Sequence, residues 1–158
     1  MLYNGPMENM MLTEEFLEEL LEARNIDDYV SMLQDSDLTC APSLAELLNQ
    51  YLEQKNLMSS KVIAKAQINS TFGYQIFMGT RQASRDKILA LAFAMRLNLR
   101  ETTRLLQAGG ANTLYAKSRR DAIIIFCLEH GYTQFECDDE LFRLGEKTIG
   151  ADGAGAVG

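Results

Sequence analysis

Histidine and cysteine, the residues that most often bind metals in proteins, are scarce in this sequence. His130 is the only histidine, and the three cysteines, Cys40, Cys127 and Cys137, are odd in number and show no CxxC spacing. A structural zinc site needs four such ligands at short spacings, and a disulfide framework needs paired cysteines. We therefore expect no metal, no cofactor and no disulfide, and we expect a cytoplasmic protein with reduced thiols.

Proline and long apolar runs are also rare. Pro6 and Pro42 are the only prolines, so most of the chain is free of this helix breaker. No apolar run approaches the roughly 20 residues that a membrane-spanning helix needs. Residues 1–11 lack the basic patch and apolar core of a secretion signal. These absences predict a soluble helical protein with no membrane partner.

No sequence pattern is typical of an active site. Gly109 and Gly110 lack the spacing and the following Lys-Ser/Thr of a phosphate-binding loop. No serine or cysteine has a context that indicates an activated nucleophile. His130, just before Gly131, fits a last-turn residue that the helix dipole favours. The glutamates between residues 14 and 22 fit one solvated helix face, and we expect no enzymatic activity.

The charges are segregated along the chain. Residues 57–120 hold 11 of the 15 Lys and Arg residues but only two acids, Asp86 and Glu101, which gives a net charge of +9. Residues 1–56 have 12 acids against two bases, and residues 121–158 have eight acids against two bases. The overall net charge of −7 therefore conceals a basic centre. A basic segment made of short helices is typical of proteins that bind polyanions such as nucleic acids.

Apolar periodicity and capping residues predict helices throughout the chain, with no strand and no internal repeat. Amphipathic helices are expected over 13–24 and about 27–33, in the acidic N-terminal part. Further helices are expected to start at Ser43 with Glu46, Ser59 or Ser60, Ser84 with Lys87, Asn98 with Glu101, and Ser118 with Asp121. Glycines 79, 109–110 and 131 are expected to end helices, and a last helix is expected over 138–146.

Residues 44–108 are expected to form a long helix, a short helix, a tight turn, a short helix, a glycine turn and two more helices. Three segments are the basis of a resemblance to a known family: Val62-Ile63 in the second helix, Ile76 to Gly79 at the end of the third, and Ser84 to Leu97 as the fourth. On these residues the stretch resembles the lambda-repressor-like helix-turn-helix regulators of the xenobiotic-response-element type.

The resemblance implies an all-α fold with helical additions at both ends. It divides the chain into an acidic helical N-terminal extension (1–42), a helix-turn-helix DNA-binding domain (43–108), a C-terminal helical extension (109–149) and a flexible tail (150–158).

Three positions depart from the pattern of that family. Ile63 stands where a small alanine is usual, Gln67 where the turn usually has glycine, and Gly73 where a branched apolar residue is usual. In the family the first and third of these positions face each other where two helices cross. We therefore interpret Ile63 and Gly73 as a volume-conserving exchange, which packed cores tolerate. Gly73 also costs its helix roughly 1 kcal/mol relative to alanine.

The resemblance assigns a DNA-facing side to the third helix. Gln75 is suited to pair with adenine, and Ser70 or Thr71 to reach bases or phosphates. The residues expected to face the major groove are Asn69, Ser70, Thr71, Tyr74, Gln75 and Met78. Those expected over phosphates are Arg81, Arg85 and Lys87, flanked by Lys61 and Lys65. One by one these side chains fit core or solvated surface better; together with the basic centre they favour DNA.

Other clusters have more than one interpretation. The arginines that could pair with the acidic N-terminal helices rather than with DNA are Arg96, Arg100 and Arg104. The residues that either extend the phosphate footprint or dock acids of a neighbouring subunit are Lys117, Arg119 and Arg120. The acidic extension, with its apolar stripe from Phe16 to Leu21, could dimerise, bind another protein, mask the basic centre, or pack on the core.

The sequence thus predicts a transcriptional regulator, a repressor that binds double-stranded DNA as a homodimer. The alternative is a protein-interaction module on the same fold, such as an adaptor, an antitoxin-like partner or an inhibitor.

Overall fold

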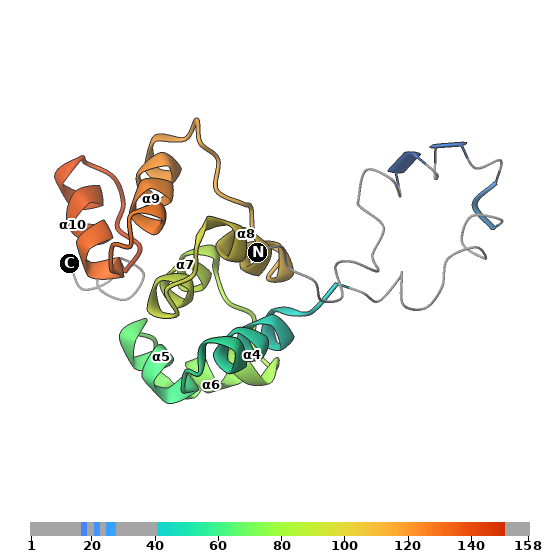
Figure 1. The fold of residues 1–158 in the computed structure, drawn as a ribbon, viewed down its shortest axis with the longest axis horizontal. Helices are drawn as coiled ribbons and strands as arrows, with labels where there is room; N and C mark the ends of the chain where they lie inside the picture. The colour runs from blue at the N-terminus through green and yellow to red at the C-terminus, as the bar shows by residue number, and fades with distance from the viewer. Residues whose placement is uncertain (1–16, 19–20, 23–24, 28–40, 151–158) are drawn as a thin grey trace. The chain divides into compact units, whose positions relative to one another are not determined.

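The computed structural model describes residues 17–18, 21–22, 25–27 and 41–150, and this part of the chain is helical, with no strand (Figure 1). Two compact units are distinguished, Met1–Pro42 and Ser43–Gly158. The second unit contains α4 (Leu44–Lys55), α5 (Ser59–Lys65), α6 (Ser70–Met78), α7 (Arg85–Ala94), α8 (Leu99–Ala108), α9 (Arg119–Glu129) and α10 (Gln134–Arg143). Among the described residues, no helix combines the length and apolarity needed to cross a membrane.

The all-α prediction is confirmed for the described part of the chain. The helices expected over 13–24 and 27–33 lie largely outside the described residues, as does the tail from residue 151 onward.

Four of the expected capping residues open helices. Ser43 and Glu46 form a reciprocal capping box at α4, and the side chain of Ser84 accepts a hydrogen bond from the backbone N–H of Lys87 at α7. Asn98 opens α8 with a second capping box, and Ser118 caps α9. Each of these bonds joins residues three apart in the chain, so local sequence is enough to predict them.

Two helix starts differ from the prediction. Neither Ser59 nor Ser60 caps α5, because Met58 is the N-cap and makes no side-chain capping bond. The last helix is α10, which begins at Gln134 and not at residue 138, because Thr133 and Glu136 form a capping box that the prediction missed. It also ends at Arg143, so the expected range of 138–146 is wrong at both ends.

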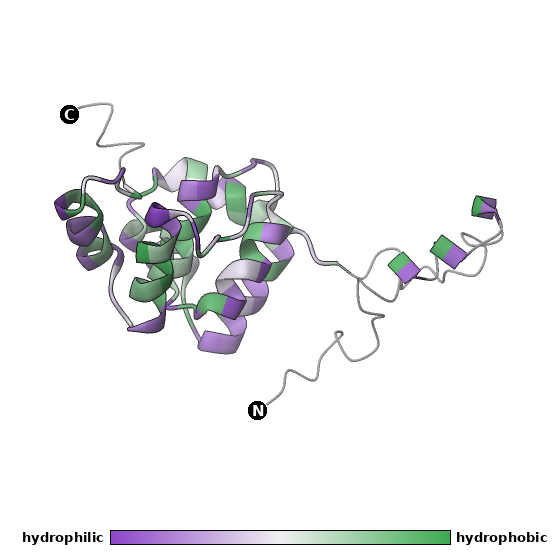
Figure 2. Ribbon diagram, turned by 90° about the horizontal axis from the view of Figure 1, so that it is seen from above, coloured by the Kyte–Doolittle hydropathy of each residue, from purple (hydrophilic) through white to green (hydrophobic). Residues whose placement is uncertain are grey.

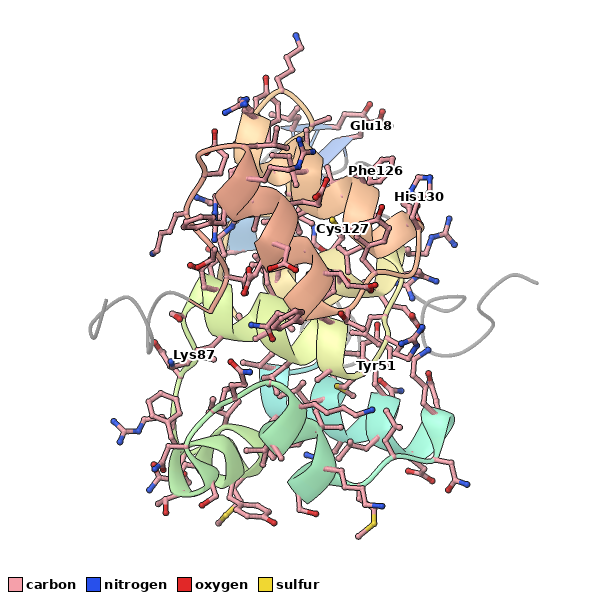
Figure 3. The ribbon with its side chains drawn as sticks, turned by 90° about the vertical axis from the view of Figure 1, so that its left-hand side faces the viewer. Glu18, Tyr51, Lys87, Phe126, Cys127 and His130 are labelled. Atoms are coloured by element: carbon pink, nitrogen blue, oxygen red, sulfur yellow. The ribbon has the colours of Figure 1, made fainter. Side chains whose placement is uncertain are left out.

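The second unit is built in layers, with α7 and α8 between the α4–α6 group and the α9–α10 pair (Figures 1 and 3). Every residue from Ile88 to Ala94 in α7 is buried, as expected of a helix that is apolar all round. The outer helices, by contrast, contain both apolar (green) and polar (purple) residues (Figure 2). Ile124 of α9 and Leu141 of α10 are fully buried in the same apolar cluster as α7, so α9 and α10 share one core with the preceding helices.

The α7–α8 and α9–α10 pairs form a structural repeat with an offset of 35 residues, from Arg85 to Arg120. The matched positions are Asp86 and Asp121 in the first turns, left-handed Arg96 and Gly131, the N-caps Asn98 and Thr133, the capping glutamates Glu101 and Glu136, and left-handed Gly110 and Gly145. The expectation of no internal repeat is therefore wrong. Most matched side chains differ, which hides the repeat from inspection of the sequence. The N-caps of α8 and α10 and the left-handed residues are kept, whereas the N-caps of α7 and α9, Ser84 and Ser118, are 34 residues apart.

Two crossed ion pairs join the repeats. Arg85 binds both carboxylate oxygens of Asp121, at 2.8 and 3.1 Å, and Arg120 binds Asp86 at 3.2 Å. Each arginine also donates to two backbone carbonyls, again at matched positions: Arg85 to Asn112 and Thr113, and Arg120 to Lys147 and Thr148. Since α7 also contacts α10 as α8 contacts α9, the two repeats meet as subunits meet across a two-fold axis.

The carboxyl group of Asp121 is buried at this joint. Burial would raise its pKa, but the hydrogen bonds from the Arg85 guanidinium and the Tyr115 N–H, with the charges of Arg85 and Arg120, outweigh burial and hold the pKa below its ordinary value. Asp121 is therefore ionised at neutral pH and holds the first turns of α7 and α9 together.

Candidate nucleic-acid interface

The helices α5 and α6 are joined by the turn Ala66–Asn69. Gln67 in this turn is left-handed (φ 58°), a conformation that glycine adopts without strain. The side-chain oxygen of Asn69 accepts a hydrogen bond from the backbone N–H of Phe72 and so caps α6. Gly79, also left-handed, ends α6 as predicted.

Ile63 of α5 packs directly against Gly73 of α6. A Cβ atom added to Gly73 would lie 2.5 Å from Cγ2 and 2.8 Å from Cγ1 of Ile63, distances that real contacts do not reach. Both residues are buried, so neither can move into solvent. The proposed exchange of volume between the two positions therefore agrees with the packing at this crossing.

The predicted groove-facing residues of α6 lie on one exposed face. Ser70 and Thr71 are exposed on the first turn, and Tyr74 and Met78 follow at spacings of three to four, with 43% and 72% of their surfaces exposed. Asn69 is exposed but uses its side-chain oxygen as the helix cap. Hydroxyl groups at one end of this face and a thioether at the other provide both polar and apolar contacts.

Gln75 is only half-buried and already has a partner. Its Oε1 accepts a hydrogen bond of 3.2 Å from Nε of Arg81. The Arg81 guanidinium also lies over the Phe72 ring, 4.8 Å from its centroid, and the Lys87 ammonium lies 5.4 Å from the same centroid. Arg81 and Lys87 thus both make cation–π contacts with Phe72, an arrangement that local sequence does not predict because it depends on how the chain turns after α6.

Four of the predicted phosphate contacts lie on α5, just after α6, and at the start of α7. Lys61 and Lys65 are exposed on α5, Arg81 is exposed beyond α6, and Lys87 is half-buried in the first turn of α7. In the described part of the chain, none of the four makes an ion pair. No acid occurs between Glu53 and Asp86 in the sequence. This surface, which we call the basic α5–α6 face (Lys61, Lys65, Tyr74, Met78 and Arg81), is therefore cationic at its exposed groups.

Arg85 does not belong to this surface, and its prediction as a phosphate contact is corrected. Its guanidinium makes four hydrogen bonds, two to Asp121 and one each to the carbonyls of Asn112 and Thr113. A phosphate at the bonded Arg85 nitrogens would have to displace Asp121 from a partly buried, bidentate ion pair. The sequence pattern could not separate Arg85 from Lys87, because the acceptors of Arg85 lie 27 to 36 residues away.

The interpretation of the second basic cluster also changes for Arg120. Arg119 donates to the Leu144 carbonyl and to Glu146, and Arg120 is held by Asp86 and two carbonyls, all within the same chain. Arg120, with 17% of its side chain exposed, is therefore held within its own chain, whereas Arg119, with 63% exposed, can still meet a phosphate or a neighbouring subunit. Lys117 remains exposed.

An open cleft of about 350 Å³ adjoins the start of α6. The turn residues Gln67 and Asn69, Phe72, Lys87 and the first residue of α10, Gln134, line it. The C-terminal repeat therefore borders the candidate interface, although the sequence placed it in a separate extension.

The remaining candidate reactive groups are enclosed or stacked. Burial is the main cause that raises the pKa of the Cys127 and Cys137 thiols, so neither is a ready nucleophile at neutral pH. The His130 ring stacks on Phe126 with centroids 3.9 Å apart, and its Nδ1 lies 2.8 Å from the Phe126 carbonyl, at the end of α9 (Figure 3). The described residues contain no group of three metal-binding side chains.

Comparison with known proteins gives no relative from which a function could be transferred. No family model, no curated protein and no solved structure matches the chain.

Proposed function

We propose that this protein is a cytoplasmic, DNA-binding transcriptional regulator, a repressor that acts as a homodimer and places α6 in the major groove. The observation that supports this is the basic α5–α6 face. An exposed helix surface with hydroxyl, amide and apolar side chains is flanked by cations that have no acidic partner among the described residues. Such a surface can bind phosphates through its cations while the exposed side chains of α6 contact base edges.

Two local features support a lambda-repressor-like helix-turn-helix over a pair of surface helices. Gln67 is left-handed in the turn at the position where that family usually has glycine. Ile63 and Gly73 pack against each other at the helix crossing where the family has a small and a large residue in the opposite order. A homodimer of such domains would read two half-sites about one helical turn, roughly 34–36 Å, apart.

Replacing Lys65 by alanine should weaken binding to every duplex alike and lower the slope of log affinity against log salt by about 1. The measurement is fluorescence anisotropy with a random-sequence duplex pool from low to physiological salt, followed by sequencing of the bound fraction. Arg100→Ala, at an exposed position on α8, is the matched control and should leave the slope unchanged. An unchanged slope for Lys65→Ala would remove α5 from the interface.

Replacing Gln75 by alanine should instead relax base preference at one position of the recovered motif, at a cost of about 1–3 kcal/mol. Because Arg81 holds the Gln75 amide, Arg81→Ala should alter the same position as well as weaken binding to all sequences. If Gln75→Ala lowers the affinity for all duplexes equally and leaves the recovered motif unchanged, another face of α6 contacts the bases.

The second candidate is a protein-interaction module. Met78 and Tyr74 expose more apolar surface than phosphate binding requires, which favours a protein partner for the same face. Folded protein that binds no duplex even at low salt would reject DNA binding and support this alternative.

A further inference from the structure

The outer face of α10 carries two strongly exposed aromatic side chains. Phe135 and Phe142 are 72% and 78% exposed, and they lie two helical turns apart on one side of the helix. Asp139, also exposed, falls between them at the same face. Large apolar side chains left in water on one helix face usually mark a contact surface.

The internal repeat provides a control for this observation. The positions on α8 that match Phe135 and Phe142 are Arg100 and Gln107, 35 residues earlier, and both are exposed. The repeated fold therefore does not need aromatic residues at these two positions. Phe135 and Phe142 must be explained by something other than the packing of the helix pair.

The charges around the two phenylalanines indicate the kind of occupant. Glu129, Glu136 and Asp139 are exposed on α9 and α10 and make no ion pair among the described residues, whereas the exposed cation of α10, Arg143, is paired with Glu140, so this face keeps a net negative charge. Two α10 helices paired antiparallel about the midpoint between Phe135 and Phe142 would bring the Asp139 carboxylates of the two copies together, and the acidic N-terminal segment carries the same sign of charge. The acidic α10 face (Glu136, Asp139, Phe135 and Phe142) requires a basic surface with apolar side chains.

This chain presents such a surface. The basic α5–α6 face combines exposed Tyr74 and Met78 with the lysines Lys61 and Lys65, which have no acidic partner in the described region. Tyr74, Met78, Phe135 and Phe142 are all exposed in one copy, so the two faces do not cover each other there, although the first turns of α6 and α10 border the same cleft. We infer that the acidic α10 face of one copy binds the basic α5–α6 face of a second copy, head to tail.

This contact differs from a two-fold dimer on DNA and does not depend on DNA binding. Because the contact joins two different surfaces, a dimer still has one free acidic α10 face on one copy and one free basic α5–α6 face on the other. Further copies can therefore add at both ends. The contact also covers the surface proposed for DNA, so self-association and duplex binding exclude each other. Association would hold the regulator in a form that cannot bind DNA, and dilution or DNA would release it.

The test is sedimentation velocity of the full chain over a range of concentrations. We expect the weight-average mass to rise about two-fold or more above the monomer as concentration increases. The rise should shrink when salt is raised from about 0.15 to 1 M, where the screening length falls from about 8 to about 3 Å. A wild-type chain that stays monomeric at all concentrations at low salt would overturn the inference.

Two variants test which surfaces meet. Phe135→Gln with Phe142→Gln removes the aromatic residues of the α10 face, and Lys65→Glu with Met78→Gln disrupts the basic face. All four side chains are exposed, so both variants should keep the helical circular dichroism of the wild type. Each variant alone should be monomeric, because each lacks one half of the contact.

A one-to-one mixture of the two variants should form a dimer and nothing larger, because only one intact contact is possible. Self-association of the basic-face variant alone would show α10-to-α10 pairing, and a monomeric mixture would show that the two faces do not meet; either result rejects the inference. The α10 variant should still bind duplex, so failure of self-association and failure of DNA binding are separate outcomes.

Discussion

Gly73→Val should destabilise the protein by about 3 kcal/mol, because overpacking a filled core forces side chains from their rotamers and shifts the backbone. The first added carbon would already lie 2.5 Å from Cγ2 of Ile63. Ile63 is β-branched and 2% exposed, so it has neither rotamer freedom nor open space to accept the contact. Urea unfolding monitored by helical circular dichroism measures the loss.

The control is a double-mutant cycle with Ile63→Ala. That substitution alone should cost about 2–5 kcal/mol, because it leaves a cavity. Combined with Gly73→Val it should cost clearly less than the sum, with a coupling of about 2 kcal/mol, since valine fills the space that isoleucine left. If Gly73→Val is neutral or stabilising, or if the two effects simply add, the two residues have not exchanged volume.

Asp121→Ala should also destabilise the protein by about 3 kcal/mol, the lower end of what removal of one partner from a buried ion pair costs. The lower value of this free-energy cost applies because the Arg85 side chain is 25% exposed, so water partly solvates its charge once the Asp121 carboxylate is removed. The Tyr115 N–H loses its acceptor as well. Asp139→Ala, which removes an exposed acid on α10 with no ion pair among the described residues, is the matched control and should change stability by less than about 0.5 kcal/mol.

The same carboxylate predicts a pH dependence. The pKa of Asp121 is lower in the folded protein than its ordinary value, so its contribution is fully present above that ordinary value and is lost as pH falls through the lowered pKa. Wild-type stability should therefore fall more steeply in acid than that of Asp121→Asn. Equal slopes for the two proteins would show that Asp121 is not the group that fastens the repeats.

The helix starts show which parts of the fold can be predicted from sequence. Ser43, Ser84, Asn98 and Ser118 were predicted correctly because each bonds to a residue three positions ahead. The start of α10 was missed although Thr133 and Glu136 form the same kind of box. The signal was present there, since Thr133 and Glu136 have the local spacing of a capping box, and Thr133 also lies 35 residues after the N-cap Asn98.

The candidate interface was predictable only in part. Which residues of α6 face outward follows from helical periodicity, and Tyr74 and Met78 are exposed as expected. The availability of the basic residues does not follow from periodicity. Lys87 and Arg85 stand two positions apart, yet one reaches the Phe72 ring and the other is held by Asp121. The acceptors of Arg85 are brought to it by folding and not by neighbouring sequence.

What the sequence determined by itself is local: the helical class, most helix ends, the outward face of α6 and the concentration of positive charge between residues 57 and 120. These depend on bonds and periodicities that span three or four residues. Only the tertiary structure decided how the arginines are used and how the C-terminal part is placed. Arg85 meets Asp121 across 36 residues and Arg120 meets Asp86 across 34, because the repeats pack on each other. Contacts between residues so far apart in the chain form only when the helices pack together. The tertiary structure therefore decides which arginines form internal ion pairs and which stay exposed at the surface.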